Sequence, residues 1–403
     1  MPRLCAVALA FLLVSEWLPA ADWPEFRGPT QQGHSTETGL PVNWSEAEHI
    51  AWKTDIAGLG WSSASIVGSQ IWLTTALDDG HSLRALQLNL TTGKIEQDIE
   101  VFALDDPGPV HKKNSHASPT ALIEDGRVYL HYGKHGTACL TTDGEIVWKT
   151  QLEYNHRHGP GGSPVVFQNL LIINCDGTDT QYVVALDKTT GKEVWKQLRG
   201  EASMAYSTPT LVNVDGQPQL ISCGGEWTMA YEPASGKELW RFRYPKGYSN
   251  VPRPVTAFGM TYVSSCYNTA TLYALKLGGS GDLTESSVAW QITKGAPRNS
   301  SPLVVGDEFY MVSDNGIITC LDAKTGEQHW QERLGGDCSA SPLFADGRIY
   351  ITNETGMTKV IATGKEYREL ANNELPGRTL ASLATADGAI FLRTDAALYR
   401  IQE

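Results

Sequence analysis

The stretch "ALDKTTGKEVW" at residues 185–195 returns almost unchanged as "CLDAKTGEQHW" at residues 320–330, which is 135 residues further along the chain. Both copies join a short aliphatic run to an aspartate, a Thr-Gly step and a tryptophan. A sequence that returns at multiples of a fixed period is typical of repeat folds, in which each copy is one structural unit that packs against its neighbours. The rest of the chain therefore has to be searched for further copies.

The search recovers a period of about 45 residues. A Ser-Pro, Thr-Pro or Arg-Pro step opens a unit at Ser118-Pro119, Ser163-Pro164, Thr208-Pro209, Arg253-Pro254, Ser301-Pro302 and Ser341-Pro342. Two flanking copies, which begin at Ser63 and Ser382, keep the same apolar rhythm without the proline. We therefore count eight units.

Each unit has the pattern of four short antiparallel strands. In residues 118–152, apolar runs are separated by turns at Asp125-Gly126 and Asp143-Gly144. Asp-Gly between alternating runs is a strong hairpin signal, because a tight primed turn needs residues that accept positive φ. One such sheet is apolar on both faces, whereas eight sheets packed around an axis bury those faces against each other. The sequence thus predicts an all-β, eight-bladed β-propeller of four-stranded antiparallel blades.

The recurring tryptophans fit the same architecture. They lie on the expected fourth strand of each unit, at Trp148, Trp195, Trp240, Trp290 and Trp330. We interpret them as structural, since a bulky ring on the outermost strand can cover the groove between blades.

The two ends of the chain predict how the ring closes. The unit that starts at Ser382 reaches Glu403 after three strands, and the segment "EHIAWKTDI" at residues 48–56 resembles the fourth strand "EIVWKTQL" of another unit. We expect this N-terminal strand, with Trp52, to complete the last blade and so to remove two exposed sheet edges. The propeller then spans residues 48–403.

The N-terminus has the pattern of an export signal. Arg3 precedes an apolar run at residues 4–14, and small residues follow at Ala20 and Ala21. The run is shorter than the roughly 20 residues that cross a bilayer. We expect a signal peptide at residues 1–21, an N-terminal extension at residues 22–47 that clasps one face of the ring, no transmembrane segment in the mature chain, and a location in the periplasm or cell envelope.

Composition removes some classes of function. The formal net charge of −13, without a basic block, argues against nucleic acid as a partner. The cysteines beyond the signal form no CxxC and no adjacent pair, and we expect them to be small buried residues rather than disulfides.

The pattern "ALDxxTGKxxW" resembles the repeat of pyrroloquinoline-quinone (PQQ) enzyme-like propellers, which quinoprotein alcohol dehydrogenases share with the BamB-like scaffold proteins of outer-membrane assembly. This WD-like resemblance covers residues 52–403. The opening "DWPEFRGPTQQGHS" at residues 22–35 also resembles the leader of secreted propellers from planctomycete-type bacteria. The resemblance implies the fold and an exported protein, but fold similarity alone does not assign a reaction.

A quinoprotein would bring recognisable chemistry. The resemblance implies a calcium-bound quinone with carboxylate and amide ligands, an aspartate base, a stacking tryptophan and a disulfide between adjacent cysteines. This chain has no Cys-Cys step and has short blades. Asp176 and Asp179 in "NCDGTDT" suit calcium, although a hairpin loop is the commoner use of such residues. We expect no cofactor, and PQQ with calcium is disfavoured.

The segments before the inner strands differ most between units, and in a propeller they rim one mouth of the central channel. They supply hydrogen-bonding groups and cations that favour an anionic or polar ligand. The predicted ligand-binding residues are Asn114, His116, His158, Tyr206, Arg253 and Asn299. Further polar side chains there include Arg298, Asp314 and Asp337. Metal binding needs three or four ligands at bonding distance, so we assign no metal ligand and no catalytic residue.

The sequence therefore favours an exported, non-catalytic propeller that acts as a monomeric binding or scaffold module in the cell envelope, with a protein partner or a polar or anionic small ligand. The alternative is a quinoprotein-type oxidoreductase or another small-molecule site at the channel mouth.

Overall fold

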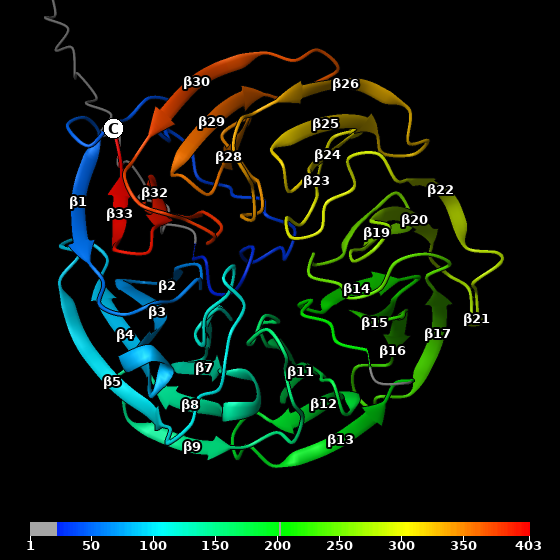
Figure 1. Cartoon of the computed structure of the whole chain (residues 1–403), viewed down its shortest axis with the longest axis horizontal. Helices are drawn as coiled ribbons and strands as arrows, with labels where there is room; N and C mark the ends of the chain where they lie inside the picture. Colours follow the sequence, from blue (N-terminus) through cyan, green and yellow to red (C-terminus); the bar gives the residue numbers. More distant parts are fainter. Residues whose placement is uncertain (1–21, 201–202) are drawn as a thin grey trace, which may run out of the picture.

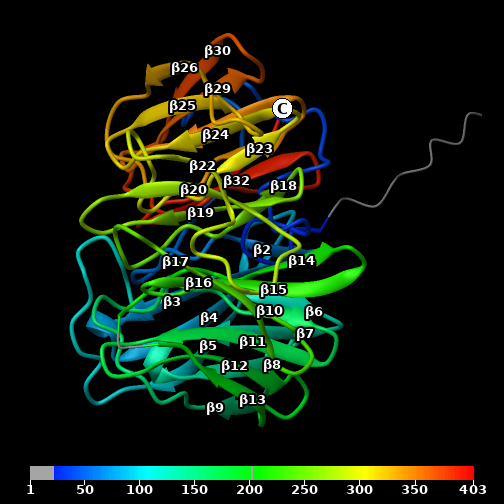
Figure 2. The same ribbon diagram turned by 90° about the vertical axis from the view of Figure 1, so that its right-hand side faces the viewer.

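The computed structural model describes residues 22–200 and 203–403, so the expected signal peptide at residues 1–21 lies outside the described residues. The chain forms a ring of eight β-sheets around a central axis, as Figure 1 shows in the view down the axis and Figure 2 from the side. The prediction of an eight-bladed all-β propeller is confirmed. Within the described ranges, no helix has the length and apolar character that crossing a membrane requires.

The first four blades follow one another along the chain. Blade 1 contains β2 (Ser65–Val67), β3 (Gln70–Leu77), β4 (Ser82–Asn89) and β5 (Ile95–Ala103), and blade 2 contains β6 (Leu122–Glu124), β7 (Arg127–His131), β8 (Thr137–Thr141) and β9 (Ile146–Thr150). Blade 3 contains β10 (Val165–Phe167), β11 (Leu170–Asp176), β12 (Gln181–Asp187) and β13 (Glu193–Leu198). Blade 4 contains β14 (Thr210–Val214), β15 (Gln217–Cys223), β16 (Trp227–Tyr231) and β17 (Glu238–Arg243), with β21 (Gly281–Asp282) as a fifth strand.

The other four blades complete the ring. Blade 5 contains β18 (Val255–Ala257), β19 (Met260–Ser265), β20 (Thr271–Lys276) and β22 (Val288–Ile292), and blade 6 contains β23 (Leu303–Val305), β24 (Glu308–Val312), β25 (Ile317–Asp322) and β26 (Gln328–Arg333). Blade 7 contains β27 (Leu343–Ala345), β28 (Arg348–Thr352), β29 (Met357–Ala362) and β30 (Glu369–Glu374). Blade 8 contains β31 (Ala384–Ala386), β32 (Ala389–Arg393), β33 (Ala397–Ile401) and the N-terminal strand β1 (Ile50–Asp55). Two 3-10 turns, η1 (Asp78–Gly80) and η2 (Gly133–His135), lie in blades 1 and 2.

The motif "ALDKTTGKEVW" shapes the turn between β12 and β13. The Asp187 carboxylate accepts hydrogen bonds from the backbone N–H groups of Thr189 and Thr190, at 3.0 and 2.9 Å. Gly191 follows at a φ of +70°, and a Cβ there would lie 2.6 Å from the ring of Trp148 in the preceding blade. The glycine is therefore required both by the turn and by the tryptophan that packs on it.

The same tryptophan contact recurs around the ring. The indole N–H of Trp148 donates to Lys188 O, that of Trp195 to Pro233 O, and that of Trp330 to Gly364 O, each at 3.0–3.1 Å. Each ring thus joins its own outer strand to a turn of the next blade, which is the structural role that the sequence predicted. Trp240 differs, because its N–H donates to Gln219 within blade 4, where β21 occupies the outer edge.

Blade 8 is completed by the N-terminal strand. β1 pairs antiparallel with β33, with Thr54 opposite Leu398 and Lys53 opposite Tyr399. The Trp52 indole donates to Leu90 O of blade 1, at 3.1 Å, and its ring packs against Gly93. The first and last blades are therefore held together by the contact that joins the other blades.

The segment before β1 runs across one face of the ring. Trp23 forms a two-hydrogen-bond bridge with Ile66 of β2, and Phe344 of β27 exchanges hydrogen bonds with Gly33 and Ser35. Trp44, which is 4% exposed, donates its backbone N–H to Asn373 of β30. These contacts reach blades 1 and 7, and the Gln32 side chain accepts the backbone N–H of Thr256 in blade 5, at 3.0 Å, across the axis from blade 1. Figure 1 shows the dark blue segment passing over the centre.

Candidate functional site

The wall of the central channel is built by hydroxyl groups that join successive blades. In six of the eight blades, the backbone N–H of the residue two positions before the inner strand donates to the hydroxyl of the equivalent residue in the next blade, at 2.9–3.0 Å. These bonds run from Ser63 to Thr120, Thr120 to Ser163, Ser163 to Thr208, Arg253 to Ser301, Ser301 to Ser341, and Ser341 to Ser382. We call these residues the hydroxyl ring.

The hydroxyl ring corrects one detail of the repeat. The sequence pattern places the start of the second unit at Ser118-Pro119, but Thr120 is the residue that takes part in the ring. Ser118 instead bonds within its own loop, to Asn114 at 2.5 Å. The step of 45 residues from Ser118 to Ser163 is therefore a coincidence of two Ser-Pro pairs at different structural positions.

Arg253 interrupts the hydroxyl ring at blade 5. Its guanidinium is fully buried and turns toward the N-terminal segment, where it donates to Phe26 O and forms an ion pair with Glu25 at 3.2 Å. Arg27, also buried, donates to Pro302 O at 2.7 Å. Burial raises the pKa of the Glu25 carboxyl, and Arg253 opposes that rise. Two buried cations and one carboxylate thus fasten the segment beneath the channel.

Above this floor lies a funnel of about 430 Å³ that is open on the opposite face of the ring. Phe26 lines its bottom and belongs to the N-terminal segment. Its wall and rim include Trp61, His111, Lys113, Asn114, His158, Tyr206, Tyr267, Arg298, Asn299 and Asp314. The channel is therefore a blind cavity with a polar rim, of a volume that suits a small ligand or a short peptide end.

Two neighbouring loops organise one side of the rim. The Asn114 amide donates to His158 O and Pro160 O, at 2.8 and 3.0 Å, and so ties the blade 2 loop to the blade 3 loop. The rings of His111 and His158 lie 5.3 Å apart, and the ring of Tyr206 lies 6.0 Å from that of His158. Burial, and then the charges of His111 and Arg157, lower the pKa of His158. This side therefore presents aromatic rings, and burial disfavours the imidazolium form of His158.

The opposite side carries most of the charge. Asp314 accepts hydrogen bonds from the backbone N–H of Arg298 and from the Asn299 amide, at 3.0 and 3.1 Å. Lys113 lies between Asp337 and Glu354, at 3.1 and 2.8 Å. Arg298, by contrast, is exposed, and its guanidinium makes no ion pair within the described part of the chain. The funnel thus keeps one cation without a direct ion pair in the described chain, although burial raises the pKa of the nearby Asp314 carboxyl and the charge of Arg298 opposes that rise.

Trp61 adds an unused donor to the wall. Its side chain is 7% exposed, and its indole N–H finds no hydrogen-bond partner among the described protein atoms. The Arg378 guanidinium lies over its ring at 5.6 Å. A buried donor that lacks a partner favours a ligand that accepts a hydrogen bond.

The structure divides the six predicted ligand-binding residues. Asn114, His158, Tyr206 and Asn299 line the funnel, as the position of their loops suggested. His116 and Arg253 do not. Arg253 lies lower in the channel wall, at the level of the hydroxyl ring. Its ion pair with Glu25 turns its side chain away from the mouth.

His116 belongs to a separate cluster between blades 1 and 3. Its ring lies 5.6 Å from that of His135, which in turn lies 5.3 Å from that of His156. One ring nitrogen of each is buried without a protein partner. Burial lowers the pKa of His135 to about 4 and of His156 to about 2, with smaller contributions from neighbouring cations. In the described chain, no three His, Cys, Asp or Glu side chains are placed to hold a metal ion.

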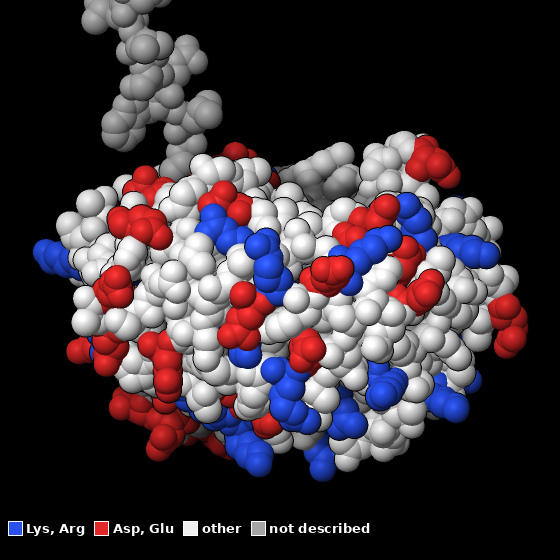
Figure 3. All heavy atoms as spheres, turned by 90° about the horizontal axis from the view of Figure 1, so that it is seen from above, with Lys and Arg blue, Asp and Glu red and all other residues white. Residues whose placement is uncertain are grey.

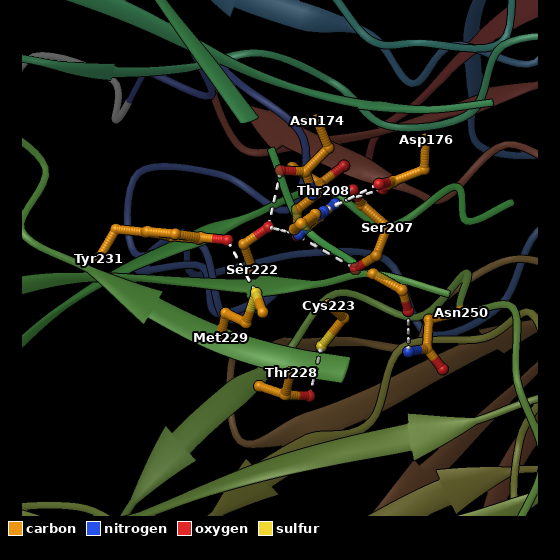
Figure 4. Close-up of polar contacts among 12 residues, drawn as sticks. Asn174, Asp176, Ser207, Thr208, Ser222, Cys223, Thr228, Met229, Tyr231 and Asn250 are labelled. Carbon is orange, nitrogen blue, oxygen red and sulfur yellow. Dashed lines mark hydrogen bonds and ion pairs between the residues drawn. The ribbon is translucent and has the colours of Figure 1, made fainter. Parts of the chain in front are cut away.

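The carboxylates of "NCDGTDT" are both occupied by internal partners. Asp176 forms a buried, bidentate ion pair with Arg199, which also donates to Ser222, and Ser222 donates to Asn174 at 2.8 Å. Figure 4 shows Asn174, Asp176 and Ser222 converging between blades 3 and 4. Asp179 accepts the backbone and side-chain N–H groups of Asn155, at 2.8 and 2.9 Å. The segment is a hairpin loop, the commoner alternative that the sequence left open.

Some residues that line the funnel escaped the sequence analysis. Trp61 lies in the segment before the first inner strand, the same position that supplied the other candidates, so its place in the repeat could have identified it. Phe26 could not be identified this way, because it reaches the funnel from outside the repeat.

The residues at the funnel do not fit a calcium-bound quinone. Asp314 is the one carboxylate that lines it in the described chain, and its oxygens already accept hydrogen bonds from Arg298 and Asn299. Calcium takes six to eight oxygen ligands, commonly from several carboxylates. A calcium-bound quinone would therefore lack most of its oxygen ligands in this funnel.

The described cysteines Cys139, Cys175, Cys223, Cys266, Cys320 and Cys338 are buried and free. Burial raises the pKa of the Cys266 thiol at the funnel, which disfavours the reactive thiolate.

Solved structures share the fold at low identity. BamB from Moraxella catarrhalis superposes with a TM-score of 0.61 at 11% identity, over 87% of this chain and 99% of that one. A europium-containing methanol dehydrogenase gives a TM-score of 0.57 at 11% identity, over 94% and 90% of the two chains. Likeness at this level shows the propeller and leaves the activity open.

Curated relatives are matched over limited lengths. The outer membrane protein assembly factor BamB of Burkholderia pseudomallei (strain K96243) is 30% identical over 105 residues, 26% of either chain. That of Legionella pneumophila (strain Paris) is 22% identical over 203 residues, 48% of this chain and 49% of that one. The serine/threonine-protein kinase AfsK of Streptomyces griseus is 23% identical over 207 residues, 50% of this chain and 24% of the kinase. The matches thus span half or less of these relatives.

A family model covers much more of the chain. The model described as outer membrane protein assembly factor BamB matches residues 68–277 and 230–388, which together include blades 2–7, most of blade 1 and the inner strand of blade 8. With the propeller and its repeats already established, the chain belongs to the BamB-type, PQQ-like family of β-propellers.

Proposed function

We propose that this chain is an exported, non-catalytic binding module of the cell envelope, and that its central funnel takes a carboxylate-bearing guest. The envelope location is supported by the relatives, which are named as outer membrane protein assembly factors. The carboxylate character of the guest is supported by the hydrogen-bond donors that line the funnel.

The observation that carries the proposal is the exposed Arg298, which makes no direct ion pair in the described chain, at the rim of a blind, polar cavity. A guanidinium binds a carboxylate through two parallel hydrogen bonds, and a partly enclosed site strengthens that attraction. The unpartnered indole N–H of Trp61 supplies a further donor in the same wall. Together these donors favour an anion over a cation or an apolar molecule.

Binding rather than catalysis fits the state of the hydroxyl groups. The hydroxyls of Thr120, Ser163 and Ser301 already accept backbone N–H bonds from neighbouring blades. The Ser118 hydroxyl bonds to Asn114, not to a histidine that could take its proton. An activated nucleophile needs an adjacent base within hydrogen-bond reach.

Calorimetric titration of the mature protein tests the proposal. The probes are citrate, a tetrapeptide with a free C-terminal carboxylate, and the same peptide amidated. We expect the free peptide or citrate to bind, and Arg298→Gln to weaken binding at least tenfold. Arg333→Gln, on the outer strand β26, is the matched control and should bind normally. Binding of neither carboxylate, or equal binding by Arg298→Gln, would contradict the proposal.

Comparing citrate with the free and amidated peptides also separates the sources of the carboxylate. Citrate binding alone favours a small anion, whereas preference for the free peptide over both citrate and the amide favours the C-terminus of a partner protein. The prediction that PQQ with calcium does not bind tightly is tested in the same protein by absorbance. A stoichiometric quinone spectrum with substrate-dependent dye reduction would overturn it.

A further inference from the structure

The outer edge of blade 4 shows how this propeller accepts an additional strand. β21, part of the insertion at residues 277–287, pairs in parallel with β17, with Trp240 opposite Gly281 and Arg241 opposite Asp282. The backbone N–H of Leu283 donates to Arg241 O, at 2.9 Å. Figure 1 shows β21 at the rim, outside β17. The outer strand of a blade can therefore bind an extended segment through its free backbone groups.

Side chains add specificity to this pairing. Leu283 and Leu239 both pack against the hydrophobic cluster of blades 4 and 5, and Leu239 is only partly exposed. Asp282 lies across from Arg241, whose charge lowers the pKa of that carboxyl after the stronger effect of the Thr284 hydrogen bonds. The added segment is thus an acidic residue followed by an aliphatic one.

Blade 3 presents the same edge without a cover. Trp195 pairs with Ala185 as Trp240 pairs with Ala230, so β13 and β17 have the same register. Val194 then corresponds to Leu239, and Lys196 corresponds to Arg241. Val194 is 54% exposed and Leu198 is 72% exposed, while Lys196 carries a positive charge on the same strand.

Blade 2 extends this apolar surface. Ile146 and Val147 on β9 are 40% and 42% exposed. Four of the seven large hydrophobic residues that the described chain exposes therefore lie on two neighbouring outer strands. Apolar side chains that gather on a sheet edge, rather than scatter singly, mark an interaction surface. By contrast, Figure 3 shows basic and acidic side chains interspersed over another side of the ring.

We propose that β13 is a docking strand for an extended segment of a partner protein, which adds in parallel as β21 adds to β17. The segment carries an acidic residue opposite Lys196 and an aliphatic residue over Val194 and Leu198. β13 is favoured over β9 because Lys196 is exposed and its side-chain contact in the described chain is with the ring of Tyr182, at 3.8 Å. Lys149, the corresponding residue of β9, lies over the ring of Phe102 and also donates to Val101 O. The proposal is independent of the funnel.

Photo-crosslinking with a defined peptide tests this docking strand. The probe has the sequence of residues 279–287, an amidated C-terminus and a diazirine analogue of leucine at the position of Leu283. Mass spectrometry locates the crosslink. We expect label on residues 193–198, at least fivefold above that from a scrambled peptide. The double variant Val194→Glu with Leu198→Glu should lose at least fivefold of it, and Arg333→Glu on β26 is the matched control that should keep it.

A second variant covers the case in which the double variant fails to fold. Lys196→Glu replaces an exposed charge that lies over the ring of Tyr182, outside the hydrophobic core, and it should reduce the label at least threefold by repelling the acidic residue. Arg298→Gln should label normally, which separates this surface from the funnel. Equal label from the scrambled peptide, label on other elements, or full label on Lys196→Glu would each overturn the proposal. Dimerisation of the free protein through β13 would also overturn it, because the occupant would then be a second copy.

Discussion

The two ends of the central channel are built from the same repeat, yet they use their polar groups differently. At the end closed by the N-terminal segment, Arg27 and Arg253 are buried and donate to backbone oxygens, and Arg253 also forms an ion pair with Glu25. At the open end, Arg298 is exposed without an ion pair and the Trp61 indole lacks a partner. The N-terminal segment at the closed end also holds buried donors without a partner among the described protein atoms, namely Arg27 Nε and the indoles of Trp23 and Trp44. The two ends therefore differ in the placement of their arginines, which are buried at the closed end and exposed at the open end.

The origin of this difference lies in the chain's connections. The closed end meets residues 22–47, which come from outside the repeat and can satisfy several blades at once. The open end meets only the loops of the repeat itself, and these vary between blades. A polar residue at the closed end is therefore best interpreted as structural, and a polar residue at the open end is a candidate for binding.

The largest expected effect comes from removing the closed end altogether. Deleting residues 22–55 removes the strand that completes blade 8, the Trp52 contact with blade 1 and the buried Trp23 and Trp44. We expect the truncated protein to aggregate or to melt far below the mature chain in differential scanning fluorimetry. Trp52→Ala should act in the same direction and lower the free energy of unfolding by up to about 3 kcal/mol, since its ring is only partly buried. A monomeric truncation with an unchanged melting temperature would mean that the ring does not depend on this end.

Acidification should have the next largest effect, through the histidine cluster beside the open end. Burial lowers the pKa of His131 to about 3, of His135 to about 4 and of His156 to about 2. The unfolded chain takes up these protons below a pH of about 6.5, whereas the folded chain does not. The contribution of these histidines to the free energy of unfolding is therefore fully present above that pH. It is lost as the pH falls toward the lowered pKa values of the folded state, by roughly 1.4 kcal/mol per histidine and pH unit.

Urea unfolding at pH 7.5 and 5.5 measures this loss. His156→Gln should flatten the dependence on pH, whereas the exposed His111→Gln is the matched control and should leave it unchanged. A stability that is equal at both pH values would show that these histidines are already protonated or open to water in the folded state.

How far the sequence alone could lead depends on the range of the contacts. The turn aspartates and glycines, such as Asp187 and Gly191, act within a few residues, so the repeat displays them openly. The strand around Trp52 was identifiable for the same reason, because it copies a repeated strand. The strands, the blade count and the tryptophan contacts were predictable on this basis.

The placements of Arg253 and His116, away from the funnel lining, arise from contacts between distant segments. Nothing near Arg253 in the sequence indicates that Glu25 will reach it across the channel floor. His116 follows Asn114 by two residues, but the loop bonds of Asn114 to Ser118 and to the blade 3 loop turn it toward Gly80 and His135. Loop direction and long-range ion pairs are set by the assembled ring, so residue type alone places such side chains poorly.

Arg253→Met tests the closed end more sharply than deletion. The substitution leaves Glu25 buried without its cation, and breaking a buried pair in this way typically costs roughly 3–5 kcal/mol. Chemical denaturation should show this loss, and the double variant Arg253→Met with Glu25→Gln should recover part of it. Arg298→Met, at the open end, is the control and should change stability by less than about 0.5 kcal/mol. Equal effects of the two arginine substitutions would remove the distinction between the ends.

The smallest expected effect concerns the hydroxyl ring, which separates the two ends. Thr120→Val keeps the shape of the side chain but removes the oxygen that accepts the Ser63 N–H, and a buried donor left unpaired costs roughly 1–3 kcal/mol. Ser118→Ala, two residues away, should cost less than about 1 kcal/mol, because Ser118 lies outside the ring and its bonds stay within one partly exposed loop. Denaturation midpoints of the two variants measure the difference. If Ser118→Ala were the more damaging, the ring would run through Ser118 after all, and the hydroxyl of Thr120 would be free to serve the funnel as a ligand-binding group.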